Sequence, residues 1–201
     1  MAIEAGTLID RHFRQSASVK LEAATICRDA ILRAAAVTTA SFRQGGKVLL
    51  CGNGGSAADS QHLAAEFTSL LRQEFSRPGL PAIALHTDTS YLTARSNDFG
   101  FEGAYSRLVE CLGRPEDVLI GISTSGNSAN IVAALLAARE RKITTIGLTG
   151  ASGGRVAAWC DVLIAVPSTS TQHIQETHIT IGHVICQLVE MELFKGAQHP
   201  P

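Results

Sequence analysis

Five short apolar runs are spaced along the chain between residues 47 and 167. Each is rich in aliphatic side chains and shows no strict alternation with polar residues. Unbroken apolarity of this kind is typical of strands that are covered on both faces, as in a parallel sheet. The predicted strands are residues 47–51, 81–86, 117–123, 144–149 and 161–167.

Stretches with helical periodicity precede, separate and follow the predicted strands. The first is rich in alanine and ends at Gly45 and Gly46, a typical helix stop. The alternation predicts an α/β fold: a three-layer α-β-α sandwich with a five-stranded parallel sheet, flavodoxin-like, plus N-terminal helices. The predicted helices are residues 17–44, 56–71, 90–111, 127–141, 153–159 and 171–194.

The sequence contains no internal repeat, low-complexity tract or linker, so we expect one domain over residues 1–201. Within it, residues 1–44 form an N-terminal helical segment, residues 45–170 the α/β core and residues 171–195 a C-terminal helix. These helices exceed what a five-stranded core must bury. We therefore expect part of their surface to contact other subunits.

Composition narrows the class of protein. The 201 residues are 45% hydrophobic and 17% charged with a net charge of -1, which provides no basic field for nucleic acid. No apolar run approaches the ~20 residues that span a bilayer, and the N-terminus lacks an apolar core of signal-peptide length. The five cysteines form no Cys-x-x-Cys pair, which favours buried thiols in a reducing compartment. We expect a cytoplasmic protein that binds neither nucleic acid nor a membrane.

Two turns that follow predicted strands carry small and hydroxyl residues. Residues 52–56 read GNGGS, and residues 123–128 read STSGNS. Glycine permits positive φ and close backbone approach, while hydroxyls and the free N–H groups of a helix N-terminus bind phosphate oxygens. Either turn alone is well explained as ordinary helix capping. Two such turns favour a phosphate site, because ligands bind at the carboxyl ends of parallel strands.

The first turn also fits a second motif. Gly52, Gly54 and Ala57 match the dinucleotide fingerprint G-x-G-x-x-G/A, and Asp88 follows the next strand, where a ribose-binding acid could lie. This alternative does not explain the STSGNS turn, nor the metal-binding residue types that follow GNGGS.

His62 and Glu66 lie four residues apart in a predicted helix, on one face and about 6 Å apart along its axis. A neutral imidazole and a carboxylate suit Zn²⁺, and either group can act as a general acid or base. A bare His-x-x-x-Glu pair is more often a solvated pair on a helix surface, so the spacing alone leaves both interpretations open.

The last predicted helix adds Gln175, Glu176, His178 and His183. Gln175 and His183 are eight residues apart, about 80° around the helix and about 12 Å along it. One straight helix does not easily bring both to one metal. If both serve a site, we expect one to reach its own subunit's site and the other a neighbour's. For His178 we favour a satisfied core or surface histidine.

Several stretches between about residue 45 and 194 carry a further signal: GNGGS with the following DSQHLAAEF, SNDFGF, GISTSGNSANI and IQETHITIGHVICQLVE. Together these motifs resemble those of the sugar isomerase (SIS) domain. The resemblance is closest to bacterial phosphoheptose isomerases, which convert sedoheptulose 7-phosphate to D-glycero-D-manno-heptose 7-phosphate. It implies an aldose-ketose isomerase of heptose synthesis, for lipopolysaccharide or a related surface glycan, and a homotetramer with active sites between subunits.

The resemblance also implies roles residue by residue. Glu66 and His183 resemble the catalytic acid/base pair, with Glu66 acting at C1 of the ketose in proton transfer through an enediol. Zinc, one ion per subunit, is expected at His62, Glu66, Gln175 and His183. Phosphate is expected at Ser123, Thr124, Ser125 and Ser128. The other expected substrate-binding residues are Asn53, Gly54, Gly55, Ser56, Glu66, Asn97, Asp98 and Gln175.

The chain departs from the family in residues 67–78, a segment longer than in the members compared. Leu70, with Arg72 nearby, stands where some members carry an arginine, so no substrate contact is carried over there. A non-catalytic relative that associates with the bacterial replication initiator reads GNGTS and lacks the Glu and the final His. This chain keeps Gly55, Glu66 and His183, which favours an enzyme over that binding protein. An isomerase of another sugar phosphate is the remaining alternative.

Overall fold

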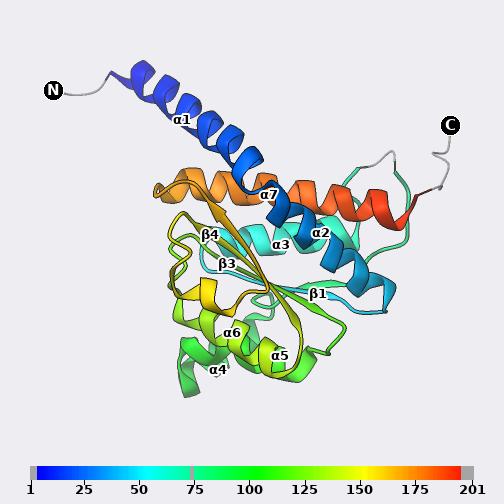
Figure 1. The fold of residues 1–201 in the computed structure, drawn as a ribbon. Helices are drawn as coiled ribbons and strands as arrows, with labels where there is room; N and C mark the ends of the chain where they lie inside the picture. The colour runs from blue at the N-terminus through cyan, green and yellow to red at the C-terminus, as the bar shows by residue number, and fades with distance from the viewer. Residues whose placement is uncertain (1–3, 73–74, 196–201) are drawn as a thin grey trace.

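The computed structural model describes residues 4–72 and 75–195 of the chain. Residues 1–3 and 196–201 of the predicted domain, and residues 73–74 of the segment 67–78, lie outside the described residues. Five parallel strands at the centre, in the order β2-β1-β3-β4-β5, confirm the predicted α/β fold (Figure 1). The strands are β1 (Val48–Cys51), β2 (Ala82–Ala84), β3 (Val118–Ser123), β4 (Thr144–Gly150) and β5 (Val162–Val166).

The central strands are buried on both faces because they are apolar throughout. All six residues of β3 are buried, and successive side chains of a strand point to opposite faces. Ile120 packs into the core on one face of the sheet, and Leu119 packs into the core on the other. The two cores explain why continuous apolarity, rather than alternation, marks these strands in the sequence.

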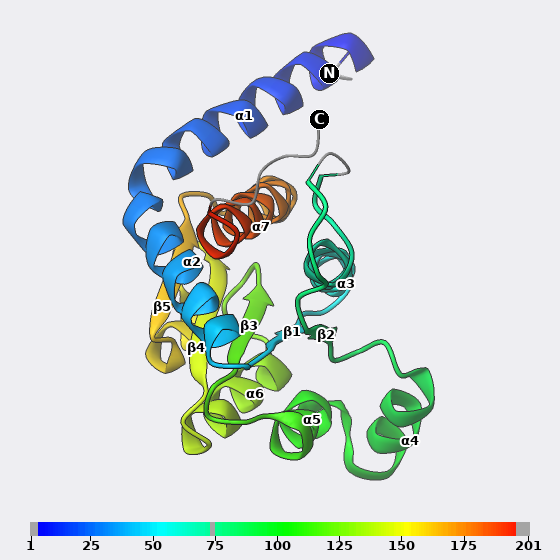
Figure 2. The same ribbon diagram turned by 90° about the vertical axis from the view of Figure 1, so that its right-hand side faces the viewer.

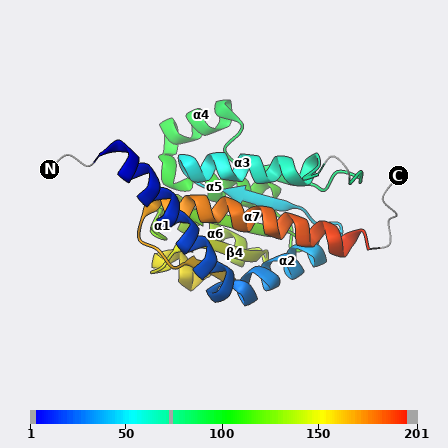
Figure 3. The ribbon, with the colours of Figure 1, turned by 90° about the horizontal axis from the view of Figure 1, so that it is seen from above.

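One face of the sheet carries the two long terminal segments and the helix that follows β1. Helices α2 (Arg28–Arg43), α3 (Gly55–Thr68) and α7 (Thr171–Leu193) pack on it. Helix α1 (Ala5–Ile26) crosses over α7 on the outside, as seen from above in Figure 3. Helix α7 therefore has neighbours on several sides: the sheet, α1, α2 and α3.

The opposite face carries the middle of the chain. Helix α6 (Ala129–Glu140) packs on β3 and β4, and α5 (Ala104–Leu112) packs on α6. Helix α4 (Thr89–Phe99) lies beyond α5, away from α3 and α7 (Figure 2). Two 3-10 helices, η1 (Phe101–Gly103) and η2 (Gly154–Trp159), complete this layer. The three layers are those expected from the sequence.

Three predicted helices differ from the structure. The stretch 17–44 is two helices that meet at Cys27, and the first of them already begins at Ala5. The stretch 90–111 is broken at Gly100, whose φ of 82° ends α4. The stretch 153–159 is a 3-10 helix that follows Gly153 at φ 69°. Apolar periodicity continued across the first two breaks and so concealed them.

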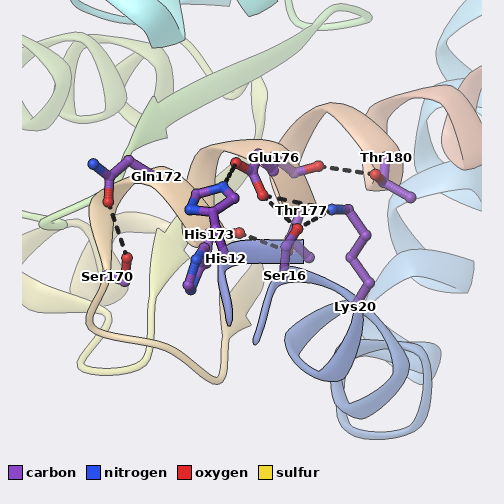
Figure 4. A network of polar contacts seen from close by, with 9 residues as sticks. All are labelled: His12, Ser16, Lys20, Ser170, Gln172, His173, Glu176, Thr177 and Thr180. Carbon is purple, nitrogen blue, oxygen red and sulfur yellow. Dashed lines mark hydrogen bonds and ion pairs between the residues drawn. The ribbon is translucent and has the colours of Figure 1, made fainter. Parts of the chain in front are cut away.

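Helix α1 projects beyond the sheet (Figure 1), and several of its apolar side chains are exposed. Phe13 and Leu21 are each 73% exposed, and Ile26 is exposed as well. A polar seam joins α1 to α7, in which Glu176 binds His12 and Ser16 (Figure 4). In the described part of the chain, no helix combines the length and apolarity that crossing a bilayer requires.

Candidate functional site

The strand order places the two small-residue turns next to each other. Strand β1 pairs directly with β3, yet the chain leaves β1 toward α3 on one face and leaves β3 toward α6 on the other. In open α/β sheets this switch point opens the crevice in which ligands bind. The Asn53 amide, after β1, exchanges two hydrogen bonds with the Asn130 amide of α6, at 2.9 and 2.8 Å. This contact joins the first turn to the helix that follows the second turn.

The first turn needs its glycines. Gly54 has a φ of 55°, a backbone region that other residues avoid. A Cβ at Gly52 would lie 2.4 Å from the Ser56 carbonyl oxygen, so the turn closes only without a side chain there. The Tyr105 hydroxyl donates to the Gly52 carbonyl oxygen at 2.7 Å and holds the turn from the α5 side. Ser56 is buried in the first turn of α3.

The second turn presents hydroxyls at the start of α6. The hydroxyls of Ser123 and Ser128 lie 3.0 Å apart, and the Asn127 N–H donates to the Ser125 hydroxyl oxygen at 3.1 Å. Gly126, at φ 68°, packs so closely on the loop after β4 that a Cβ there would lie 2.2 Å from the Gly153 carbonyl oxygen. The predicted phosphate residues thus occupy one short, rigid turn.

A cavity of about 200 Å³ lies beside this turn, and most of the residues that line it carry a hydroxyl group. It includes Thr124 and Ser125, which the sequence predicts as phosphate ligands. Sequence reasoning missed the other hydroxyl residues, although PSTST directly after the fifth apolar run is a third hydroxyl-rich turn of the same kind. Those residues are Ser152, Ser168, Thr169 and Thr171.

His62, Glu66 and His183 form one cluster, which we call the His-Glu-His group. The Nε2 atoms of the two histidines are 2.9 Å apart, and His62 Nε2 lies 3.2 Å from Glu66 Oε1. Their potential ligand atoms all lie within 4.8 Å of one another. Two imidazoles and a carboxylate are the donor set of catalytic zinc sites, which hold three protein ligands and keep one position open.

The group exists because α3 and α7 pack very closely. Gly182 precedes His183, and a Cβ at Gly182 would lie 2.5 Å from a terminal methyl carbon of buried Leu63. Leu63 in turn follows His62 on α3. The glycine that interrupts the apolar pattern of the last helix is therefore the point of contact that brings the histidines together.

Gln175, the fourth predicted ligand, lies beside the first turn of α3. Its amide packs against Gly55, where a Cβ would lie 1.8 Å from Gln175 Nε2. Burial raises the pKa of the neighbouring Asp59 carboxyl, an effect that its hydrogen bond with Gln175 and the charge of His62 partly offset. Gln175 is thus close to the glycine turn and outside the His-Glu-His group. Its sharing between subunits stays a prediction.

Asn97, Asp98 and His178 have hydrogen-bond partners outside the His-Glu-His group. The Asn97 amide donates to Asp98 at 2.9 Å on exposed α4, which packs on η1 and α5. His178 is fully buried and donates Nε2–H to the Thr149 carbonyl oxygen at 3.0 Å, which confirms the interpretation as a core histidine. Its Nδ1 has no hydrogen-bond partner among the described residues. Burial lowers the pKa of His178 to about 4.

Known proteins are similar to this chain over most of its length. A family model described as the SIS domain matches residues 12–150. A phosphoheptose isomerase of Roseiflexus sp. (strain RS-1) is 60% identical over 155 residues, 77% of this chain and 78% of that protein.

Two solved structures share the fold closely. The phosphoheptose isomerase of Neisseria gonorrhoeae has a TM-score of 0.87 at 46% identity, over 92% of this chain and 98% of that one. The enzyme of the same name from Francisella tularensis has a TM-score of 0.90 at 36% identity, over 94% and 100%.

Proposed function

The chain belongs to the SIS-domain family, within its phosphoheptose isomerases, and from this premise we propose that it converts sedoheptulose 7-phosphate to D-glycero-D-manno-heptose 7-phosphate. The observation that carries the proposal is the His-Glu-His group, which α3 and α7 bring together, and α3 begins at the glycine turn that follows β1. The product is expected to enter heptose synthesis for a surface glycan such as lipopolysaccharide.

Phosphate binding would provide the orientation that the reaction needs. The STSGNS turn and the hydroxyl-lined cavity supply neutral donors, and the N-termini of α6 and α7 add free N–H groups and the positive ends of two helix dipoles. Anchoring the remote phosphate there converts binding energy into a fixed position of C1 and C2. Asn53, Gly54, Gly55, Ser56, Asn97, Asp98 and Gln175 stay predicted contacts of the sugar.

The chemistry moves protons between two carbons and two oxygens. A base removes a proton from C1 of the ketose, O2 gains a proton to give the enediol, and protonation at C2 with loss of the O1 proton gives the aldose. We assign removal of the C1 proton to the Glu66 carboxylate. His183 would be the other member of the acid/base pair. Both lie in the His-Glu-His group, and the proposal requires C1 and C2 of the bound substrate to lie within their reach.

The donor set of the group also fits a zinc ion, one per subunit. A bound zinc ion would stabilise the negative charge that develops on the substrate oxygens as a Lewis acid. His62, Glu66 and His183 would hold it. Gln175 is the predicted fourth ligand.

The proposal also covers the oligomeric state of the protein and its location in the cell. The exposed apolar side chains of α1, such as Phe13 and Leu21, support burial of this helix between subunits, as in the proposed homotetramer. A tetramer would also let Gln175 or α4 complete a neighbour's site. We propose that the protein acts in the cytoplasm, where its five free cysteines would stay reduced.

The proposal is tested with sedoheptulose 7-phosphate in D₂O, followed by NMR with added zinc and with a chelator. The parent chain should form the aldoheptose phosphate with deuterium at C2. Glu66→Gln should lower kcat by about 10²–10⁴-fold, because it removes the base but keeps the shape of the side chain. Glu140→Gln, an exposed change on α6, is the matched control and should retain parental turnover.

Two outcomes of this experiment would contradict the proposed mechanism or the proposed function. Near-parental turnover in Glu66→Gln would remove Glu66 from the mechanism. A folded parent chain that turns over nothing in any metal condition would contradict the isomerase and favour the non-catalytic relative or another sugar phosphate.

A further inference from the structure

Arg77 lies near the end of the segment that connects α3 to β2 and turns back onto α3. Its Nη2 donates to the Glu66 carbonyl oxygen at 2.7 Å, and its Nη1 donates to the Phe67 carbonyl oxygen at 2.9 Å. These carbonyls lie in the last turn of α3, where no later N–H group of the helix is available to donate to them. Arg77 therefore caps the end of the helix that carries His62 and Glu66.

The same guanidinium is anchored on α7. Its Nε donates to Glu190 Oε1 at 2.6 Å, and the Arg77 and Glu190 side chains are each 1% exposed. Glu190 follows His183 by seven residues, about two turns, so both side chains lie on the same face of α7. Arg77 thus joins the two helices whose contact creates the His-Glu-His group.

Building on the proposed isomerase, we propose that Arg77 is a positioning residue for Glu66. By bonding to the Glu66 carbonyl from a buried anchor on α7, it sets where the carboxylate stands relative to His62 and to C1 of the substrate. A displacement of about 1 Å in a reacting group can cost about 100-fold in rate. Without Arg77 the Phe67 carbonyl oxygen would keep the Leu80 N–H at 2.9 Å, whereas the Glu66 carbonyl oxygen would lose its Arg77 donor. That loss would allow a displacement of this kind at Glu66, because the following segment contains no regular secondary structure before β2 in its described residues.

Only arginine can make this set of contacts. The planar guanidinium offers five N–H donors in a rigid fork, and here it serves a carboxylate and two helix-end carbonyls at once. A lysine ammonium is a point charge on a flexible stem. It can keep the ion pair with Glu190 but cannot hold the same fork on Glu66 and Phe67.

The test uses Arg77→Lys, the double variant R77M/E190M and the control Arg43→Lys. Arg43 is a matched control because it also donates to a backbone carbonyl and a carboxylate of α7, both of Glu192, but on the exposed side. In Arg77→Lys, kcat should fall about 10- to 100-fold while KM stays within about threefold. Arg43→Lys should retain parental values.

The double variant separates positioning from mere support of the fold. Replacing both partners of a buried ion pair by apolar residues is often neutral for stability. The thermal midpoint of R77M/E190M should therefore lie close to that of the parent. Its kcat should nevertheless stay about 10- to 100-fold low, because the Glu66 carbonyl has lost its donor. Crystal structures of the parent and Arg77→Lys should show the Glu66 carboxylate displaced from its 3.2 Å contact with His62.

The proposal is overturned by parental kcat in Arg77→Lys or in R77M/E190M, or by a loss that lies entirely in KM. An unmoved Glu66 in the crystal structure of Arg77→Lys would overturn it as well. If the parent chain shows no turnover, the proposed function fails, and the crystallographic comparison still decides the role of Arg77.

Discussion

Two arginines bind neighbouring glutamates near the C-terminal end of α7, one inside the protein and one at its surface. Arg77 binds Glu190 on the α3 side, and each side chain is 1% exposed. Arg43 of α2 binds Glu192, and these side chains are 55% and 40% exposed. The two glutamates are two residues apart, about 200° around the helix, so they face different surroundings. The same chemical pair therefore has two different environments on one helix.

Burial, rather than the ion pair as such, decides what each of the two contacts contributes. At the surface, water replaces a lost partner, and the pair contributes little to the free energy of unfolding. Inside the protein nothing replaces it, so loss of one partner leaves a charge uncompensated. A buried pair also holds a single arrangement, which is what a positioned carboxylate at Glu66 needs.

The largest expected difference between the Arg77–Glu190 and Arg43–Glu192 pairs is in the free energy of unfolding. Glu190→Gln should lower the free energy of unfolding by about 3–5 kcal/mol, because Arg77 is left as a buried, uncompensated charge. Glu192→Gln, the matched change on the exposed side, should leave the urea midpoint within experimental error. Urea unfolding of the two variants and the parent measures both. Equal midpoints for the two variants would break the comparison.

His178 extends the comparison to the side of α7 that faces the sheet. Its pKa is lowered to about 4 by burial, so the folded state keeps the ring neutral. Unfolded histidine titrates near pH ~6.5, so the unfolded state binds the proton first as the pH falls. The free energy of unfolding should therefore fall by up to about 1.4 kcal/mol per pH unit between pH ~6.5 and about 4, and then level off.

The difference between two unfolding series isolates His178 from other titrating groups. Urea unfolding at several pH values between 7.5 and 4.5 should give a shallower slope for His178→Asn than for the parent. Parallel slopes would show that the buried ring is not the source of the acid sensitivity.

The smallest expected effect lies in the α1–α7 seam of Figure 4. Partial burial raises the pKa of the Glu176 carboxyl, but hydrogen bonds from Ser16 and His12 and the charge of Lys20 outweigh this and lower it overall. The seam is more than a third exposed, so solvent screens its charges. Glu176→Gln should cost less than about 1 kcal/mol in free energy of unfolding, and less still in 1 M NaCl.

Glu22→Gln, an exposed change elsewhere on α1, is the control for that measurement. A loss in Glu176→Gln as large as that in Glu190→Gln, or one that salt does not reduce, would mean that the seam behaves as a buried pair.

Much of the fold was predictable because its signals are local. The aliphatic runs marked all five strands, and the turns GNGGS and STSGNS marked the crevice before the strand order was known. The spacing of His62 and Glu66 placed both on one face of α3. The break at Cys27 and the 3-10 character of η2 were missed, because apolar periodicity continues through the first and does not distinguish helix types at the second.

The parallel sheet, the turns at its edge and the kinds of side chain available for catalysis could be predicted from the sequence, because each depends on residues close together in the chain. Which side chains meet depends on the packing of helices that are far apart in the chain. His183 joins His62 across 121 residues, and Arg77 joins Glu190 across 113. Such pairs have no local pattern, because they result from the close packing of α3 on α7 that Gly182 permits. The same packing decided that one arginine pair is buried and the other is in water.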